Sequence, residues 1–339
     1  MAVLVTGASG FLGGRLVELL AARGERVILV ARQSSRLTHL DHLTSDPSGQ
    51  VVAVRVEIGS WAEAVPESLR AVLPEVTHIY HCAGCSTDWA PPETYYAGNV
   101  VATQSLLGVA TQAPRLERFV HVSTTDIYGY PVIPGDETQP AVDVGLGYNH
   151  TKILGEQAAW AAAAAGLPVT IVRPASIYGP RGTAFVTDIA KLLRERTMAL
   201  VDGGRVPGGF VYVDDVAEAM MAAAESPATL GRAYNLSSLQ GETWKQYCVG
   251  LALAMSVPAP WINLPFAVAM AVGTAMEAPH RYLRVPGRPL LTRHAVYLLG
   301  RDQEFPSSRA QAEFGYGPRV SLEQGIDRSA AWLRDQARG

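Results

Sequence analysis

The chain has 339 residues, of which 48% are hydrophobic and 17% charged, and its formal net charge is −3. This length and apolar content predict one large domain or two interlocked ones with a substantial core. The nearly balanced charge gives no electrostatic reason to expect a nucleic-acid partner. Three cysteines are too few for a disulfide framework, and no Cys/His cluster has zinc-finger spacing, so we expect a cytoplasmic protein without a metal site.

The first motif is a glycine-rich turn between an apolar run and a helical pattern. Residues 3–5 predict a strand, and the helical pattern after the turn ends at Gly24. Glycines here would let backbone amides approach a pyrophosphate at the start of the helix, where the helix dipole favours negative charge. We therefore predict a dinucleotide site rather than a merely structural turn. The residues assigned to it are Gly7, Ser9, Gly10, Phe11, Leu12 and Gly13.

The end of the second predicted strand, residues 27–30, bears on the choice of cofactor. An NAD site usually places an acid there to hold the ribose diol, but no acid occurs between Glu25 and Asp41. Arg32 and Arg36 are better suited to a 2′-phosphate, so the sequence favours NADP(H) and leaves NAD(H) open. The alternative is that both arginines are ordinary solvated surface residues.

Residues 51–58 predict a third strand. Its end, Glu57 and Ile58, lines an adenine pocket in one interpretation and is only structural in the other. A polar helix is expected over residues 61–73.

A fourth strand, residues 78–82, runs into small residues at Cys82, Ala83 and Gly84. Small side chains where a strand stops would let a cofactor lie close to the backbone, so these three residues are assigned to cofactor binding. Cys82 and Cys85 form a C-x-x-C pair. Without a second pair we interpret both thiols as packing or pocket-lining groups rather than redox groups.

Two further sites follow in the chain. Asn99 is a polar residue in an apolar helical pattern. Its side chain either caps the helix or faces solvent, or it holds a water in a proton path to Lys152. The fifth strand, residues 119–123, ends in Ser123, Thr124 and Thr125. Hydroxyls at the carboxyl end of a strand lie where an open α/β sheet presents its chemistry.

Tyr148 and Lys152 are four residues apart at the start of a predicted helix that ends at Gly166, so they share one face. An ammonium beside a phenol favours the phenolate, lowers the tyrosine pKa and lets the hydroxyl exchange a proton with an alcohol or ketone. With 13 tyrosines in the chain such a pair also arises by chance, but lysine is rare here and arginine would not replace it beside a phenol.

The rest of the chain departs from regular alternation. Residues 169–173 and 210–213 predict strands, and Asp214 or Asp215 is expected to cap a helix over residues 216–225. A capping box at residues 321–324 is expected to start the last helix. Residues 264–276 are apolar but too short to span a bilayer, so a buried helix or pocket wall is expected there. Aromatic residues are expected to line an apolar cavity: Trp244, Tyr247, Trp261, Phe266, Tyr282 and Tyr297.

The glycine turn, Asn99, the Ser123–Thr124 strand end and the Tyr148/Lys152 pair occur in an order that resembles the extended short-chain dehydrogenase/reductase family, most closely its 3β-hydroxysteroid dehydrogenase-like and ketoreductase branch. The resemblance covers nearly the whole chain and implies a doubly wound Rossmann α/β fold with a smaller, mostly helical substrate-binding region. It implies Tyr148 as general acid/base, Lys152 as its pKa tuner and ribose ligand, Thr124 as donor to the carbonyl, and Asn99 as relay support.

The resemblance also extends the assignments. Ser123, Pro174 and Ile177 join the cofactor site, together with Tyr148 and Lys152. The substrate is expected against Ser86, Trp89, Thr124 and Tyr148. Residues 1–176 are predicted to form the cofactor-binding core, to which 207–236 and 301–339 return, while 177–206 and 237–300 form the substrate-binding region. A homodimer built on the helices bearing Asn99 and Tyr148 is a family expectation.

Three functions follow from these residues. The favoured one is an NADP(H)-dependent ketoreductase or alcohol dehydrogenase for a largely apolar small molecule of steroid, polyketide or ketoacyl type. The second is a nucleotide-sugar epimerase or dehydratase with tightly bound NAD. Gly208 and Gly209 stand where that branch often has an arginine, which disfavours this function, although Arg205 could take the arginine's place. The third, a non-catalytic NADP(H) sensor, fits poorly with an intact Thr124, Tyr148 and Lys152.

Overall fold

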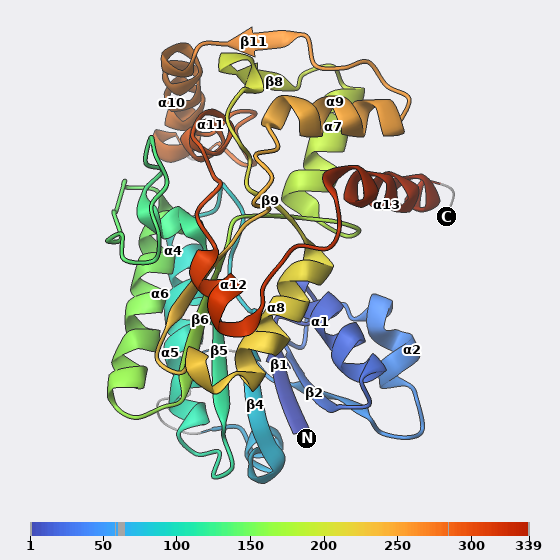
Figure 1. Ribbon diagram of the computed structural model, residues 1–339, viewed down its shortest axis with the longest axis vertical. Coiled ribbons are helices and arrows are strands. Elements are labelled where there is room, and N and C mark those ends of the chain that lie inside the picture. The colour runs from blue at the N-terminus through green and yellow to red at the C-terminus, as the bar shows by residue number, and fades with distance from the viewer. Residues whose placement is uncertain (1, 58, 60–64, 284, 338–339) are drawn as a thin grey trace.

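The computed structural model describes residues 2–57, 59, 65–283 and 285–337. Seven parallel strands form one sheet in the order β10-β6-β5-β4-β1-β2-β3, which confirms the predicted Rossmann-type α/β fold (Figure 1). The strands are β1 (Ala2–Thr6), β2 (Arg26–Ala31), β3 (Val51–Arg55), β4 (Val76–His81), β5 (Arg118–Val122), β6 (Val169–Pro174) and β10 (Ala233–Leu236).

Helices cover both faces of this sheet, which is why its strands are almost continuously apolar. Val3 and Val5 of β1 pack toward α1 (Phe11–Ala22) and α8 (Val213–Glu225). The alternate residue Leu4 packs toward α5 (Ala102–Ala110) and α6 (Gly147–Ala164) on the other face. Successive side chains of a strand point to opposite faces, so one short apolar run supplies both cores.

The strand order sets the place of the site. From β1 the chain moves to β2 and β3 on one side, then crosses back to β4 on the other side of β1. In an open parallel sheet, a crevice opens outside the carboxyl ends of the strands where the order reverses. The carboxyl ends of β1 and β4 mark that point here.

Shorter elements lie beyond the carboxyl edge of the sheet. Figure 1 shows α7, α9, α10 and α11 gathered there with β8 and β11. The remaining elements are α2 (Asp41–Thr44), α3 (Glu67–Arg70), α4 (Pro92–Tyr96), α7 (Ile189–Arg194), α9 (Trp244–Ala254), α10 (Phe266–Tyr282), α11 (Arg293–Gly300), α12 (Ser308–Phe314), α13 (Leu322–Gln336), β7 (Ser176–Tyr178), β8 (Ala199–Val201), β9 (Phe210–Tyr212) and β11 (Ile262–Leu264). Helix α12 packs against β10, and α13 packs against α9. How the chain divides between cofactor and substrate regions stays a prediction.

Two local predictions were wrong in extent. The helix expected over residues 61–73 includes 61–64, which lie outside the described residues, and its described part is helical only from Glu67, because Pro66 has an extended backbone (ψ 137°). Helix α8 begins at Val213, so Asp214 and Asp215 lie inside its first turn and do not cap it. Asp215 instead accepts from the backbone of Arg319 at 3.0 Å.

The last helix starts as predicted. The Ser321 hydroxyl accepts a hydrogen bond from the amide of Gln324, and the Gln324 side-chain oxygen accepts one from the amide of Ser321. These two bonds form a complete capping box. Residues 264–276 fall largely within α10, but the expected burial is wrong, because Ala269 and Gly273 alone are buried in this stretch and Val268 and Met276 are exposed. No helix in the described part of the chain is long and apolar enough to cross a membrane.

Candidate active site

The predicted dinucleotide turn lies where β1 meets β4. Gly7 has φ +72°, and a Cβ there would lie 2.6 Å from the Ala83 amide nitrogen. The Gly10 amide donates to the Gly7 carbonyl at 2.9 Å, which closes the turn. The positive φ and the lack of room both exclude a side chain at Gly7, so the turn packs directly on the backbone of Cys82 and Ala83 at the end of β4.

The start of α1 suits an anionic ligand. Its first turn contains no acid, and Ser9 and Gly10 are exposed just before it. The Phe11 ring packs against the loop at Gly179 and Gly182. The Leu12 side chain lies in the core, so only its backbone can serve a cofactor. Unpaired amides at a helix start, with the dipole behind them, fit a pyrophosphate.

The arginine-bearing loop after β2 is held by a residue that the sequence did not single out. Arg55, at the end of β3, donates to the carbonyls of Arg32 at 3.2 Å and Ser35 at 2.7 Å, while Arg32 and Arg36 are themselves exposed. The Glu57 carboxylate accepts from the Gln33 amide at 3.0 Å. The structure thus brings an acid to the place where the local sequence has none. Ile58, its predicted neighbour in the adenine pocket, lies outside the described residues.

The strand-end hydroxyls and the tyrosine are brought together at the carboxyl end of β5. Thr124 caps the short helical turn of residues 125–128 by accepting from the Asp126 amide at 3.2 Å, and a hydrogen bond joins its side chain to Tyr148. The Ser123 hydroxyl is buried without a partner in the described structure. Buried polar groups normally have partners, so Ser123 fits a site that a polar part of a cofactor completes.

Tyr148 lies on α6, as the spacing predicted, but the predicted lowering of its pKa is wrong. Burial raises the pKa of Tyr148, and the Asp126 charge raises it further, whereas the hydrogen bond with Thr124 lowers it. The Lys152 ammonium donates instead to the Val122 carbonyl at 2.7 Å. Burial is therefore the largest influence on the pKa of Tyr148 in this structure.

Lys152 is itself strongly affected by its surroundings. Burial lowers the pKa of Lys152 to about 8, and the nearby Glu156 carboxylate opposes that shift. Burial, with a further contribution from the same ammonium, lowers the pKa of His81 to about 3. The charged form of Lys152 is therefore disfavoured by its burial and destabilises the folded protein.

Replacing Lys152 by methionine is expected to stabilise the fold at pH 7 by about 1–3 kcal/mol, because the penalty of burying the ammonium disappears. The sign follows from the pKa of about 8 against an ordinary 10.5, since the folded protein binds the proton less well than the unfolded one. The penalty is full below pH 8 and fades between pH 8 and 10.5. Chemical denaturation should show an advantage that shrinks over that range, and an advantage constant with pH would contradict the assignment.

Asn99 connects two parts of the candidate site. It lies in a π-helical turn, Ala97–Val101, a feature often found at functional sites. Its side chain accepts from the Cys85 amide at 2.7 Å and donates to the Thr151 hydroxyl at 3.0 Å, which joins the loop after β4 to α6. This amide is therefore committed to protein partners. A part for Asn99 in a proton path stays a prediction.

The remaining predicted contacts lie on several loops. Gly84 and Ser86 are exposed in the loop after β4, and the Trp89 ring there stands edge-on to His280 at 5.9 Å. Pro174 ends β6 as a buried residue, and Ile177 lies half-buried in β7. Burial raises the pKa of the Cys82 thiol to about 12, which fits a packing role rather than a redox one.

The expected aromatic cavity is not formed as predicted. Trp244 and Tyr247 pack into the core against Phe210, with ring centroids 4.9 and 4.3 Å away, whereas Trp261 and Tyr282 are 70% and 77% exposed. The prediction rested on the presence of large rings alone, which does not show whether a ring faces the core, a cavity or solvent. Two others lie together, because the rings of Phe266 and Tyr297 are 6.0 Å apart.

Sequence reasoning missed three buried groups near Tyr148, namely Asp126, Tyr130 and His294. The His294 ring stacks on the Tyr148 ring with centroids 5.4 Å apart, and His294 Nε2 lies 2.8 Å from the Asp126 carboxylate. The Tyr130 hydroxyl donates to the same carboxylate at 2.9 Å. Asp126 stands two residues after Thr124, which was a usable signal, but nothing in the sequence placed His294 there.

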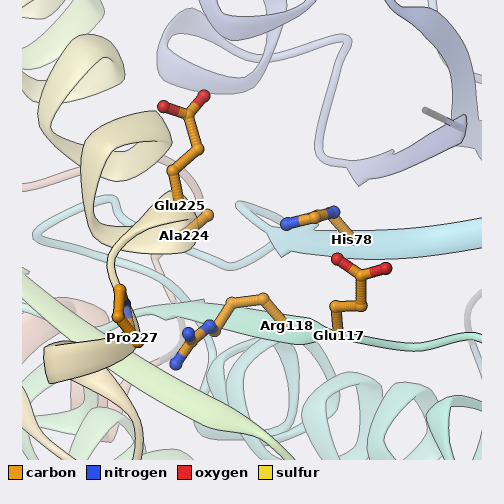
Figure 2. Close-up of a pocket in the computed structure, with 6 residues that line it drawn as sticks. All are labelled: His78, Glu117, Arg118, Ala224, Glu225 and Pro227. Atoms are coloured by element: carbon orange, nitrogen blue, oxygen red, sulfur yellow. The ribbon is translucent and has the colours of Figure 1, made fainter.

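A separate hollow lies at the other edge of the sheet. Figure 2 shows His78 and Arg118 near the amino ends of β4 and β5, facing a hollow of about 270 Å³. Because these are the amino ends, the hollow is remote from the carboxyl edge. No predicted site residue lines it.

The family follows from comparison with known proteins. Residues 3–237 match the model of the NAD-dependent epimerase/dehydratase family. The chain belongs to this family. As an extended short-chain dehydrogenase/reductase it is an NAD(P)-dependent oxidoreductase.

Relatives within the family show what such chains do elsewhere. The chain is 31% identical, over 96% of its length and 95% of the relative's, to a 4-hydroxy-2-methyl-3-oxo-4-farnesyl-3,4-dihydroquinoline-1-oxide ketoreductase of Stigmatella aurantiaca. It is 29% identical, over 98% of its own length and 99% of the relative's, to a 2-alkyl-3-oxoalkanoate reductase of Stenotrophomonas maltophilia. A UDP-glucuronic acid 4-epimerase of Bacillus cereus, solved with NAD, shares the fold with a TM-score of 0.77 at 20% identity, over 99% of each chain.

Proposed function

We propose that this protein is an NADP(H)-dependent ketoreductase that transfers hydride between the nicotinamide and a ketone or secondary alcohol of a largely apolar substrate. The observation that supports it most is the hydrogen-bonded Thr124–Tyr148 pair, with Lys152 one helical turn from Tyr148, at the carboxyl end of β5. Hydroxyl, phenol and ammonium together are suited to proton exchange with a carbonyl oxygen.

Each group would have one task. NADP(H), when bound, supplies or accepts the hydride. The glycine turn would hold its pyrophosphate, and the partnerless Ser123 hydroxyl would meet one of its polar groups. In the reduction direction Tyr148 gives its phenolic proton to the carbonyl oxygen while the Thr124 hydroxyl donates a hydrogen bond to that oxygen. The Lys152 charge favours the phenolate left on Tyr148.

The substrate class is supported by the relatives' names. One is a ketoreductase of a farnesyl-bearing 3-oxo compound and another a reductase of 2-alkyl-3-oxoalkanoates. We therefore propose a β-keto compound with an alkyl or isoprenoid substituent. The test is NADPH absorbance loss with a panel of β-keto esters, ketosteroids and ketoacyl compounds. Stoichiometric consumption with one member supports the proposal, and none with any member contradicts it.

NADP(H) preference has a direct test in Arg32 and Arg36. Changing both to glutamine should weaken NADPH binding about ten- to a hundredfold, because a hydrogen bond to a charged group contributes about 1.5–3 kcal/mol, while NADH binding stays unchanged. Fluorescence titration with NADPH and with NADH measures the ratio of their dissociation constants. Arg115→Gln is the matched control. An equal loss of affinity for both cofactors would mean that Arg32 and Arg36 do not bind a 2′-phosphate.

A nucleotide-sugar epimerase or dehydratase is the second candidate. The Glu57 carboxylate favours it, because this residue follows β3 but contacts the Gln33 amide just after β2, where an acid suits the ribose diol of NAD. Against it, a side chain at Gly208 would overlap the Phe210 ring and one at Gly209 would overlap the Gln303 carbonyl, so neither position admits the arginine of that branch. Purified protein that carries NAD(H) and consumes no NADPH would favour this candidate.

A further inference from the structure

Asp126 and His294 form a buried acid–base pair on the face of the Tyr148 ring. Their side chains are 9% and 5% exposed, and Nε2 of the imidazole lies 2.8 Å from a carboxylate oxygen. The imidazole ring is nearly parallel to the phenol ring, at an interplanar angle of 20°. A charge on this pair therefore acts on Tyr148 through a medium with little water, where electrostatic interactions are strong.

The chain holds His294 in this place from several sides. It is the second residue of α11, whose N-cap Thr292 accepts from the Ala295 amide at 3.0 Å. The Thr292 hydroxyl in turn donates at 2.8 Å to Asp88, in the loop after β4. The start of α11 is thus attached to the side of the site that carries Cys85 and Trp89. Imidazole Nδ1 is buried without a partner in the described structure, so the ring has one fixed partner and one nitrogen free to take a proton.

The pair has two charge states with opposite effects on the phenol. With a neutral imidazole the pair carries the full negative charge of Asp126, which disfavours a second negative charge on Tyr148. With a proton on His294 the pair is neutral overall, and a cation lies against the phenol face, where it is attracted to the ring electrons. The rings stack rather than meet edge to edge, so the proton stays on the imidazole and is not passed to the phenol oxygen.

We propose that Asp126 and His294 control the charge on Tyr148: the pair allows the phenolate while His294 is protonated and holds Tyr148 as the phenol when His294 is neutral. His294 is then a positioning residue that acts through Tyr148, supplied by the segment between residues 240 and 300. This deepens, and rests on, the proposed ketoreductase function.

Other ionisable groups face the pair and are part of its electrostatics. The Tyr130 hydroxyl donates to Asp126, and its ring lies 5.9 Å from His294 and 4.9 Å from Tyr297. Lys152 on α6 interacts electrostatically with Asp126. Next to His294, Arg293 is paired with Glu277 at 2.8 Å. Cys85 and Tyr95 also lie near Tyr148, and burial raises the pKa of each, which keeps both side chains neutral.

The kinetic test uses two variants that should move in opposite directions. Single-turnover reduction of ethyl 2-methyl-3-oxobutanoate by NADPH is measured from about pH 5.5 to about pH 9, the span in which an imidazole titrates. For the unmodified protein the rate constant should fall about tenfold as pH rises. This is about the effect expected from one unit of charge on His294 at contact distance from the phenol ring. Asp126→Asn should lie at or above the acidic level of the unmodified protein throughout, because its pair is neutral or positive and never negative. His294→Gln, whose amide can still donate to Asp126, should stay near its alkaline level throughout.

The opposite plateaus separate charge control from a structural role. The proposal is overturned if both variants keep the pH dependence of the unmodified protein. It is also overturned if the rate constants of both variants are reduced to the same level. Equal NADPH binding in all three proteins, measured by fluorescence, checks that the fold is intact.

A second measurement does not depend on activity. In the NADPH complex, nitrogen NMR of labelled histidines follows the His294 signal, which is identified by its loss in His294→Gln. At one fixed pH, this signal should move toward that of a neutral imidazole in Asp126→Asn, because the carboxylate that favours the imidazolium is gone. An unchanged signal overturns the pair. If the protein reduces no β-keto ester but the signal moves, the pair stands and the proposed function fails.

Discussion

Changing Tyr148 to phenylalanine is expected to lower kcat for ketone reduction by about a thousandfold, the usual size of a lost general acid in the transition state. The phenyl ring keeps the stacking on His294 at 5.4 Å but has no proton for the carbonyl oxygen. NADPH affinity should change by less than about threefold, since the glycine turn and Arg32 are unaffected. Single-turnover kinetics and NADPH fluorescence measure the two quantities.

Tyr96→Phe is the matched control, because Tyr96 is 49% exposed on the neighbouring helix and should lose no activity. A Tyr148→Phe protein that keeps more than about a tenth of its activity would mean that another group delivers the proton. Loss of NADPH binding in parallel would instead indicate a structural role for the phenol.

The second large effect is on stability. Arg173 on β6 donates to the Glu156 carboxylate of α6 through two nitrogens, at 3.1 and 2.5 Å, and both side chains are under a tenth exposed. Changing Arg173 to methionine leaves the buried Glu156 carboxylate without its cation, with the Trp160 indole as a neutral donor at 3.1 Å, and is expected to cost about 3–5 kcal/mol in the free energy of unfolding. The Tyr128 hydroxyl also loses its donor at 2.6 Å. Urea denaturation followed by circular dichroism measures the loss.

Arg319→Met removes an arginine from an ion pair with Glu218 whose side chains are 79% and 39% exposed. An exposed pair contributes about 0–1 kcal/mol, so this control should change little. Equal losses in the two variants would show that burial does not decide the strength of the Arg173 pair. A further Glu156→Leu change should recover part of the loss, because it removes the unpaired charge.

Several parts of the site could be predicted because the signal is local. The glycine turn needs backbone room and a positive φ at Gly7, and only glycine meets both. Tyr148 and Lys152 share a face because helical spacing brings residues four apart together. Thr124 ends a strand, and strand ends of a parallel sheet meet at one edge. Each prediction depends on a few neighbouring residues.

Other parts could not be predicted, because their partners come from distant segments. Arg55 holds the Arg32 loop from the next strand, and His294 reaches Asp126 across 168 positions. The sequence suggested that Lys152 would lower the tyrosine pKa, but burial raises it, and burial is a property of the assembled site. Asp214 looked like a helix cap in sequence, yet it accepts from Arg15 at 2.7 Å.

The sequence by itself determined the Rossmann fold and predicted the dinucleotide turn and the Thr124, Tyr148 and Lys152 group, because runs of apolar residues, glycine spacing and helical periodicity act over short distances. Only the tertiary structure decided the electrostatic surroundings of Tyr148. Those depend on which side chains from the far segments around Asp126 and His294 are buried together, and water exclusion, which sets the strength of their charges, arises only once the chain has packed.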